Sequence, residues 1–136
     1  NWNNFKNPRR DMVWVAIAGP VTNFILAALS YGLLMLLFSN SGSELSGFFP
    51  LLIFSWLLLG ILVNLALGIF NLIPVPPLDG GRVAVGLLPV QLARPLARLE
   101  PYGIIIVFGI LMTGIFDHVF SAIFRFVAGL PIPGIN

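Results

Sequence analysis

The sequence predicts an all-α polytopic membrane protein with about three transmembrane helices, a broken Pro/Gly-rich segment and an interfacial helix. Of the 136 residues, 58% are hydrophobic and 9% are charged, whereas a soluble domain carries about a quarter charged residues. Between Val13 and Leu78 the one charged side chain is Glu44. So few charges cannot cover a water-soluble surface, and this excludes an ordinary soluble domain.

Two apolar stretches open the predicted fold. Residues 13–38 and 48–73 are each long enough to cross a hydrocarbon core of about 30 Å with some tilt. The Gly19-Pro20 pair is expected to kink or break the first turns of the first stretch without ending it. Between the two stretches, residues 39–47 are rich in Ser and Gly and predict a short loop.

The second half of the chain predicts a break, a surface helix and a third crossing. Residues 74–81 hold prolines and paired glycines and cannot form regular helix. Residues 82–100 space their arginines among Val, Leu and Ala, which predicts a helix at the membrane interface. Residues 102–126 reach spanning length only by continuing through Asp117 and His118. We expect all of 1–136 to form one membrane domain.

The charges predict orientation and exclude some classes of function. With the N-terminus of this chain in the cytoplasm, six of the seven basic residues lie on that side, as the positive-inside rule expects. This predicts an integral multi-pass protein of the cell (plasma) membrane. The sequence has no basic stripe interleaved with aromatic residues, so we expect no nucleic-acid partner. Zero cysteines exclude a disulfide, a thiolate metal site and a cysteine nucleophile within it.

A few polar residues interrupt the apolar stretches. Asn23, Asn64 and Asn71 are expensive in a membrane, and Asp79 follows the second stretch. Each asparagine has a structural interpretation, in which it bonds to a neighbouring helix or to a backbone group near a break. Taken alone, Asp79-Gly80 is as typical of a turn as of a functional site.

The combination of these residues is more specific. The run from Asn71 to Gly81 reads N-x-x-P-x-P-x-x-D-G-G, and in this the chain resembles the site-2 protease family of intramembrane zinc metalloproteases. Residues 18–23 read A-G-P-x-x-N and are similar to the family's second recurring sequence. Further similarity runs through residues 6–12 and 99–103, so the resemblance covers most of the chain.

The resemblance implies roles for individual residues. Asp79 matches the carboxylate ligand of one zinc ion, and Asn71 matches an asparagine that hydrogen-bonds the substrate or the developing oxyanion. A loop that exposes strand-like edges to an extended substrate is matched by Pro74, Pro76, Gly80 and Gly81. Structural positions are matched by Gly19, Pro20 and Asn23. The implied activity is hydrolysis of peptide bonds in membrane-spanning protein substrates, within the lipid bilayer.

The chain departs from the family in one respect. The family's catalytic helix carries H-E-x-x-H, which supplies two zinc ligands and a general base. This sequence has one histidine, His118, with no partner at that spacing, and we interpret it as an interfacial polar residue. The family's H-E-x-x-H helix precedes the matched part and the sequence begins with Asn1, so we expect an N-terminal segment of the same protein to supply the histidines. The 136 residues alone are then expected to be inactive.

Two alternatives stay open from the sequence. The chain also fits a catalytically inactive relative or fragment that binds membrane partners without cleaving them. A transporter fragment with an ion site at the broken helix is the other alternative, because helix breaks in transporters coordinate ions.

Overall fold

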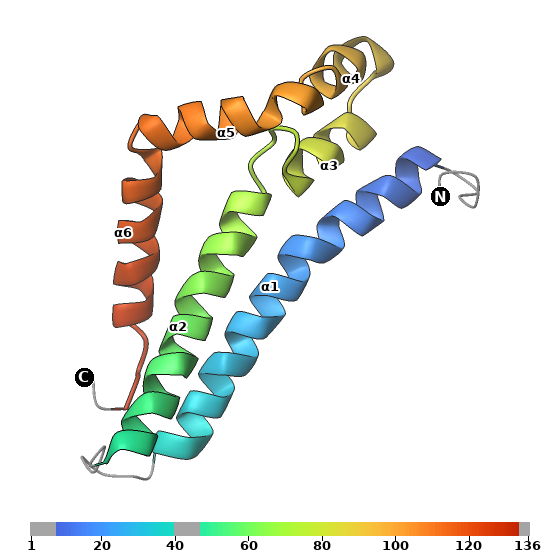
Figure 1. Ribbon diagram of the computed structural model, residues 1–136. Coiled ribbons are helices and arrows are strands. Elements are labelled where there is room, and N and C mark those ends of the chain that lie inside the picture. Colours follow the sequence, from blue (N-terminus) through green and yellow to red (C-terminus); the bar gives the residue numbers. More distant parts are fainter. Residues whose placement is uncertain (1–7, 40–46, 134–136) are drawn as a thin grey trace. The chain divides into compact units, whose positions relative to one another are not determined.

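The computed structural model describes residues 8–39 and 47–133, and all regular secondary structure in these ranges is helical (Figure 1). Lys6 and Asn7, which contribute to the family resemblance, lie outside the described residues, as does most of the predicted loop 39–47. Three helical stretches are long and apolar enough to cross a membrane. The predicted fold class is therefore confirmed.

Two of these stretches are single long helices. α1 spans Pro8–Phe38 and α2 spans Phe48–Asn71. Apart from the charged first turn of α1, each is apolar around its whole circumference, as expected of a helix whose surroundings are lipid and other helices. Within α1 and α2 the candidate membrane spans are Arg10–Phe38 and Phe48–Asn71.

α1 continues through the Gly19-Pro20 pair as one helix. Pro20 has no N–H, so one carbonyl of the preceding turn loses its helical partner. Two residues later, the Thr22 hydroxyl donates a hydrogen bond of 2.7 Å to the Ala18 carbonyl. A hydroxyl satisfied within its own helix is the usual arrangement at a lipid-facing position.

The structure differs from the expected third crossing at 102–126. α5 (Gly103–Met112) ends before Thr113, and α6 (Ile115–Ala128) begins after Gly114. Gly114 has a φ of 74°, a left-handed conformation that glycine adopts without steric cost and that ends helices. The third apolar stretch long enough to cross is instead Val90–Met112, ahead of this break.

The expected interfacial helix 82–100 is also divided. α3 (Asp79–Leu87) ends at Leu88, whose extended conformation is the one favoured before a proline, here Pro89. α4 (Val90–Ala97) packs against α3, and the 3₁₀ turn η2 (Glu100–Tyr102) leads into α5 (Figure 1). Because α3 starts at Asp79, the irregular segment is also shorter than the predicted 74–81.

The chain divides into two compact units. The motif unit comprises the described part of Asn1–Thr22 together with Leu67–Phe116. In it the rings of Phe70 and Phe116 stack with their centroids 4.0 Å apart. Both sequence motifs have their defining residues in this unit, apart from Asn23.

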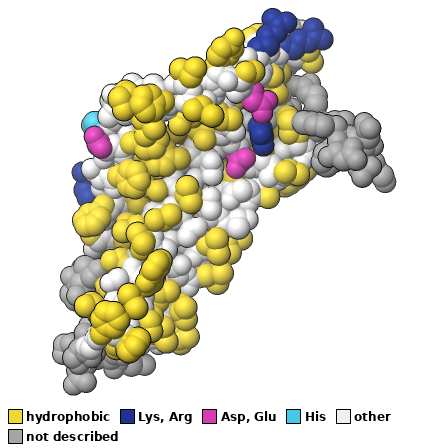
Figure 2. All heavy atoms as spheres, in the orientation of Figure 1, with side chains coloured by type: hydrophobic (Ala, Val, Ile, Leu, Met, Phe, Trp, Pro, Cys, Tyr) yellow, Lys and Arg dark blue, Asp and Glu magenta, His cyan; other side chains and the backbone are white. Residues whose placement is uncertain are grey.

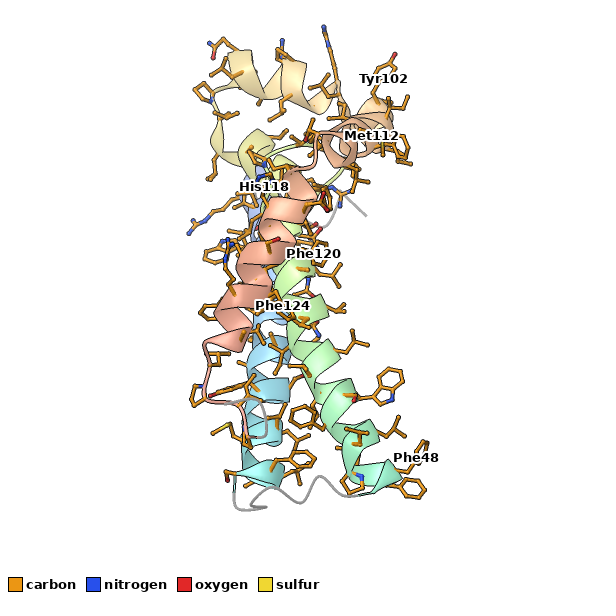
Figure 3. The ribbon with its side chains drawn as sticks, turned by 90° about the vertical axis from the view of Figure 1, so that its left-hand side faces the viewer. Phe48, Tyr102, Met112, His118, Phe120 and Phe124 are labelled. Atoms are coloured by element: carbon orange, nitrogen blue, oxygen red, sulfur yellow. The ribbon has the colours of Figure 1, made fainter. Side chains whose placement is uncertain are left out.

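The span unit comprises the described parts of Asn23–Ala66 and Asp117–Asn136. Leu34, Ile61 and Ile132 are fully buried in it, and Phe38 meets Phe54 edge-on at 5.5 Å. On α6 the side chains of His118, Phe120 and Phe124 are all exposed (Figure 3). Hydrophobic side chains also cover much of the molecular face in Figure 2, as expected of a surface in contact with lipid.

Candidate metal centre at the motif loop

The motif loop, residues 72–78, folds as a series of tight turns. After the last residue of α2, the Leu72 and Ile73 amides each donate a hydrogen bond of 3.1 Å to the carbonyl three residues earlier, as in a 3₁₀ turn. The Val75 amide then bonds to the Ile73 carbonyl at 2.8 Å, and the Leu78 amide bonds to the Val75 carbonyl at 3.0 Å. The Pro76–Pro77 peptide bond in this last turn is cis, as in type VI turns.

Glycines let backbone segments approach closely around this loop. A side chain on Gly80 would collide with the Leu72 and Ile73 carbonyls, and one on Gly81 would lie 2.7 Å from the Pro76 Cα. A side chain on Gly103, at the start of α5, would lie 2.7 Å from the Pro76 oxygen. The obstacles are backbone atoms or a proline ring, so the start of α3 and the start of α5 are held tightly against the loop.

The strand-like edge expected for this loop is not observed. No residue of 72–78 is in a strand, and the three prolines of the loop have no N–H to offer. The amides of Val75 and Leu78 are used within the loop itself. Residues 74–78 therefore have no free backbone donor, and because the Val75 and Leu78 carbonyls already accept backbone hydrogen bonds, the acceptors left in this segment are proline carbonyls. Of the four predicted loop residues, Pro74 is exposed, whereas Pro76, Gly80 and Gly81 are buried.

The two sequence motifs meet at Gly19 and Asp79. A Cβ atom added to Gly19 would collide with the Asp79 Oδ2 and would lie 3.3 Å from its Cγ. The carboxylate of Asp79 therefore rests directly on the α1 backbone at the one position of A-G-P that has no side chain. The next residue, Pro20, is fully buried. This contact joins positions sixty residues apart in the sequence.

A pocket of ≈ 260 Å³ opens beside Asp79. Apolar side chains from α1, the motif loop, α3 and α4 form most of its wall, and three charged residues complete it. The lining residues are Met12, Val15, Ala16, Pro76, Asp79, Arg82, Val85, Ala97 and Glu100. A carboxylate in a mostly apolar concavity matches the general pattern of ligand and metal sites.

The Asp79 carboxylate is available in this arrangement. Within residues 8–39 and 47–133 its oxygens have no hydrogen-bond or ion-pair partner, although the side chain is half-buried. Asn71, the last residue of α2, is half-buried too, and its side-chain amide has no hydrogen-bond partner in the same part of the chain. Both predicted functional groups are thus left open to a ligand.

Asp79 fits zinc as one ligand of a larger set. A catalytic zinc ion takes three protein ligands, and carboxylate oxygens are among the usual ones. Among the described residues, no group of three His, Cys, Asp or Glu side chains is placed to hold a metal. His118 is an exposed residue of the span unit, and it does not belong to the unit that contains Asp79.

The two other asparagines of the apolar stretches, Asn64 and Asn23, lie within α2 and α1. Asn64 donates a hydrogen bond of 2.8 Å to the Gly60 carbonyl of its own helix. This is a structural role, but its partner is neither the neighbouring helix nor the backbone group near a break that we expected. Asn23 lies in α1, half-buried, and belongs to the span unit.

Two features of the site were not predicted from the sequence. Arg82 donates to Glu100 across 3.3 Å, and both line the pocket with Asp79. The second is Gly103, whose missing side chain lets the start of α5 pack directly against the loop. The spacing from Asp79 to Arg82 places them on neighbouring positions of a helix, but nothing local indicated Glu100 as the partner.

Comparison with known proteins now adds to this geometry. The model of Peptidase family M50 matches residues 4–114, which include both motifs and the whole loop. This chain belongs to peptidase family M50. The resemblance to site-2 proteases is thereby confirmed.

Several relatives of this chain are named as zinc metalloproteases. YwhC of Bacillus subtilis (strain 168), named "Putative zinc metalloprotease", is 37% identical over 115 residues, which are 85% of this chain and 52% of that protein. Zinc metalloprotease MJ0392 of Methanocaldococcus jannaschii is 38% identical over 83 residues, 61% of this chain and 22% of that protein. The chain thus spans about half the length of the first relative and less of the second. No solved structure gives a significant match.

Proposed function

We propose that this chain contributes the carboxylate ligand and a substrate-binding amide to an intramembrane zinc metalloprotease of the site-2 type. The substrate class is membrane-spanning proteins, and the reaction is hydrolysis of a peptide bond within or beside the membrane. Family membership and the names of the relatives support zinc proteolysis. The contact between Gly19 and Asp79 is the observation that supports the proposal for this chain, because it brings a residue of each family motif side by side.

Each group at the site has a distinct task in this proposal. Asp79 binds the metal through a carboxylate oxygen, while the buried glycines and prolines around it fix its backbone. The Asn71 amide donates a hydrogen bond to the substrate carbonyl oxygen. Bound zinc supplies Lewis-acid chemistry and a water-derived nucleophile near neutral pH. In this proposal two histidine ligands and a general base come from residues outside these 136.

The loop binds substrate through acceptors in this proposal. Because residues 74–78 offer carbonyls and no free amide, an extended substrate would donate its own N–H groups to the exposed loop at Pro74. Pro76, Gly80 and Gly81 are buried and shape the loop instead of touching the substrate. Asn71 then supplies the complementary donor.

The test uses the complete protein in proteoliposomes with a single-span substrate. D79N is expected to lose both zinc and cleavage, since an amide is a poor zinc ligand. N71A is the matched variant: it should keep its zinc while cleavage falls about 10²- to 10³-fold, as when an oxyanion donor is removed. Zinc is measured by elemental analysis on the same samples. Full zinc content and cleavage in D79N would refute the ligand assignment.

The transporter alternative has one structural basis, the helix break at the loop. It predicts ion flux into liposomes that is insensitive to a zinc chelator. Chelator-sensitive cleavage of the single-span substrate contradicts it. If the chain belongs to a catalytically inactive relative, the purified complete protein should show no ion flux and no cleavage, and it should contain no zinc.

A further inference from the structure

Three charged side chains line the Asp79 pocket, and two of them form an ion pair. Asp79 and Arg82 lie three residues apart in α3, on neighbouring positions of one helix face. Arg82 Nη2 donates to Glu100 Oε1 at 3.3 Å, and Glu100 begins the η2 turn. All three side chains line the same pocket. Arg82 therefore shares the pocket with two carboxylates, and it pairs with Glu100, which is further away in the sequence than Asp79.

The pairing of Arg82 has a consequence for the carboxylate of Asp79. A guanidinium stays protonated at all relevant pH values and matches a carboxylate in geometry. Helical neighbours at this spacing form ion pairs readily, so an Arg82 released from Glu100 has Asp79 as its next partner. Such a pair would occupy the oxygens that a metal needs, and an unpaired guanidinium nearby would also repel a cation.

The pair gives little as a stabilising contact. Its side chains are 50% and 51% exposed, and exposed ion pairs contribute about 0–1 kcal/mol to folding. Its position beside an otherwise unpartnered carboxylate is the more specific feature.

We propose that Glu100 is a positioning residue: by holding the Arg82 guanidinium, it keeps Arg82 off Asp79 and leaves that carboxylate open for zinc. The inference rests on the proposed function of Asp79 as zinc ligand. It deepens that function by naming a residue that tunes metal affinity without touching the metal.

The experiment measures zinc affinity directly, by competition with a chromophoric chelator, on the purified complete protein. E100Q is expected to bind zinc about fivefold more weakly, the effect of one unit charge in a solvated site. The double variant R82Q/E100Q removes the competing cation and should return zinc affinity to within about twofold of the parent. R82Q alone should bind zinc at least as tightly as the parent.

A matched control separates this role from a change in net charge. D117N makes the same charge change at an exposed position of α6, in the span unit, and should leave zinc affinity unchanged. Parental zinc affinity in E100Q would overturn the proposal. So would weak binding that R82Q/E100Q fails to restore, since Glu100 would then act on the metal itself. Failure of the proposed function looks different: the parent and D79N would bind zinc equally.

Discussion

The motif unit and the span unit differ in what limits the approach of their helices. At Gly81 of the motif unit the nearest obstacles are backbone atoms of the loop, and at Gly103 they are the ring of Pro77 and backbone atoms of the loop. At Gly60 of the span unit, the nearest obstacle is the Ser30 hydroxyl, 2.9 Å from where a Cβ would lie. A hydroxyl can rotate away, whereas a turn closed by its own hydrogen bonds cannot. We therefore expect the loop of the motif unit to resist displacement at these glycines, and the contact at Gly60 in the span unit to tolerate a larger side chain.

The largest effect is expected at Gly103. G103A places a methyl group against Pro77 and the Pro76 oxygen, and should destabilise the protein by about 3 kcal/mol or more, the upper range for overpacking. Gly109 lies in the same helix with nothing within 4 Å, so G109A is the control. Thermal unfolding in detergent measures both. Equal melting temperatures would show that the loop yields, which breaks the contrast between the units.

A smaller effect is expected at Gly60. G60A meets a side chain that can change rotamer, so its cost should be about 1 kcal/mol. The double variant G60A/S30A removes the obstacle and should recover the parental melting temperature. If G60A is as damaging as G103A and S30A gives no recovery, the span unit is as rigid as the motif unit.

The smallest effect is expected at Asn64. N64A removes a hydrogen bond to a carbonyl of its own helix. Hydrogen bonds between helices in membranes contribute about 0.6 kcal/mol, and we expect this bond within one helix to contribute no more. Zinc content and cleavage should equal those of the parent. A loss of activity without a loss of stability would instead place Asn64 in the functional site.

The sequence predicted the features that depend on composition and local pattern. Long uncharged stretches are enough to predict α1 and α2, and the motif predicts functional roles for Asp79 and Asn71 that stay predictions. We expected the third crossing at 102–126, whereas the third apolar stretch of the structure is Val90–Met112. Residues 102–126 are largely apolar, with Asp117, His118 and Arg125 as exceptions. Their hydropathy hides the break at Gly114, where a left-handed glycine ends α5.

Features that depend on tertiary contacts could not be predicted from the sequence. Gly19 and Gly103 become constrained only when distant segments pack on them, and Glu100 becomes the partner of Arg82 only when η2 lies near α3. The family resemblance implied that the loop would offer strand-like edges. The hydrogen bonds of Val75 and Leu78 close it into turns instead.

The contact of Gly19 with Asp79 is tested most directly by zinc affinity in G19A. The added methyl must displace the carboxylate, so zinc affinity is expected to fall about tenfold while the protein stays folded, in the range seen when a ligand's supporting contact is lost. G32A is the control, because Gly32 lies in the same helix with nothing within 4 Å, and it should bind zinc like the parent. Equal zinc affinity in G19A, G32A and the parent would contradict the account.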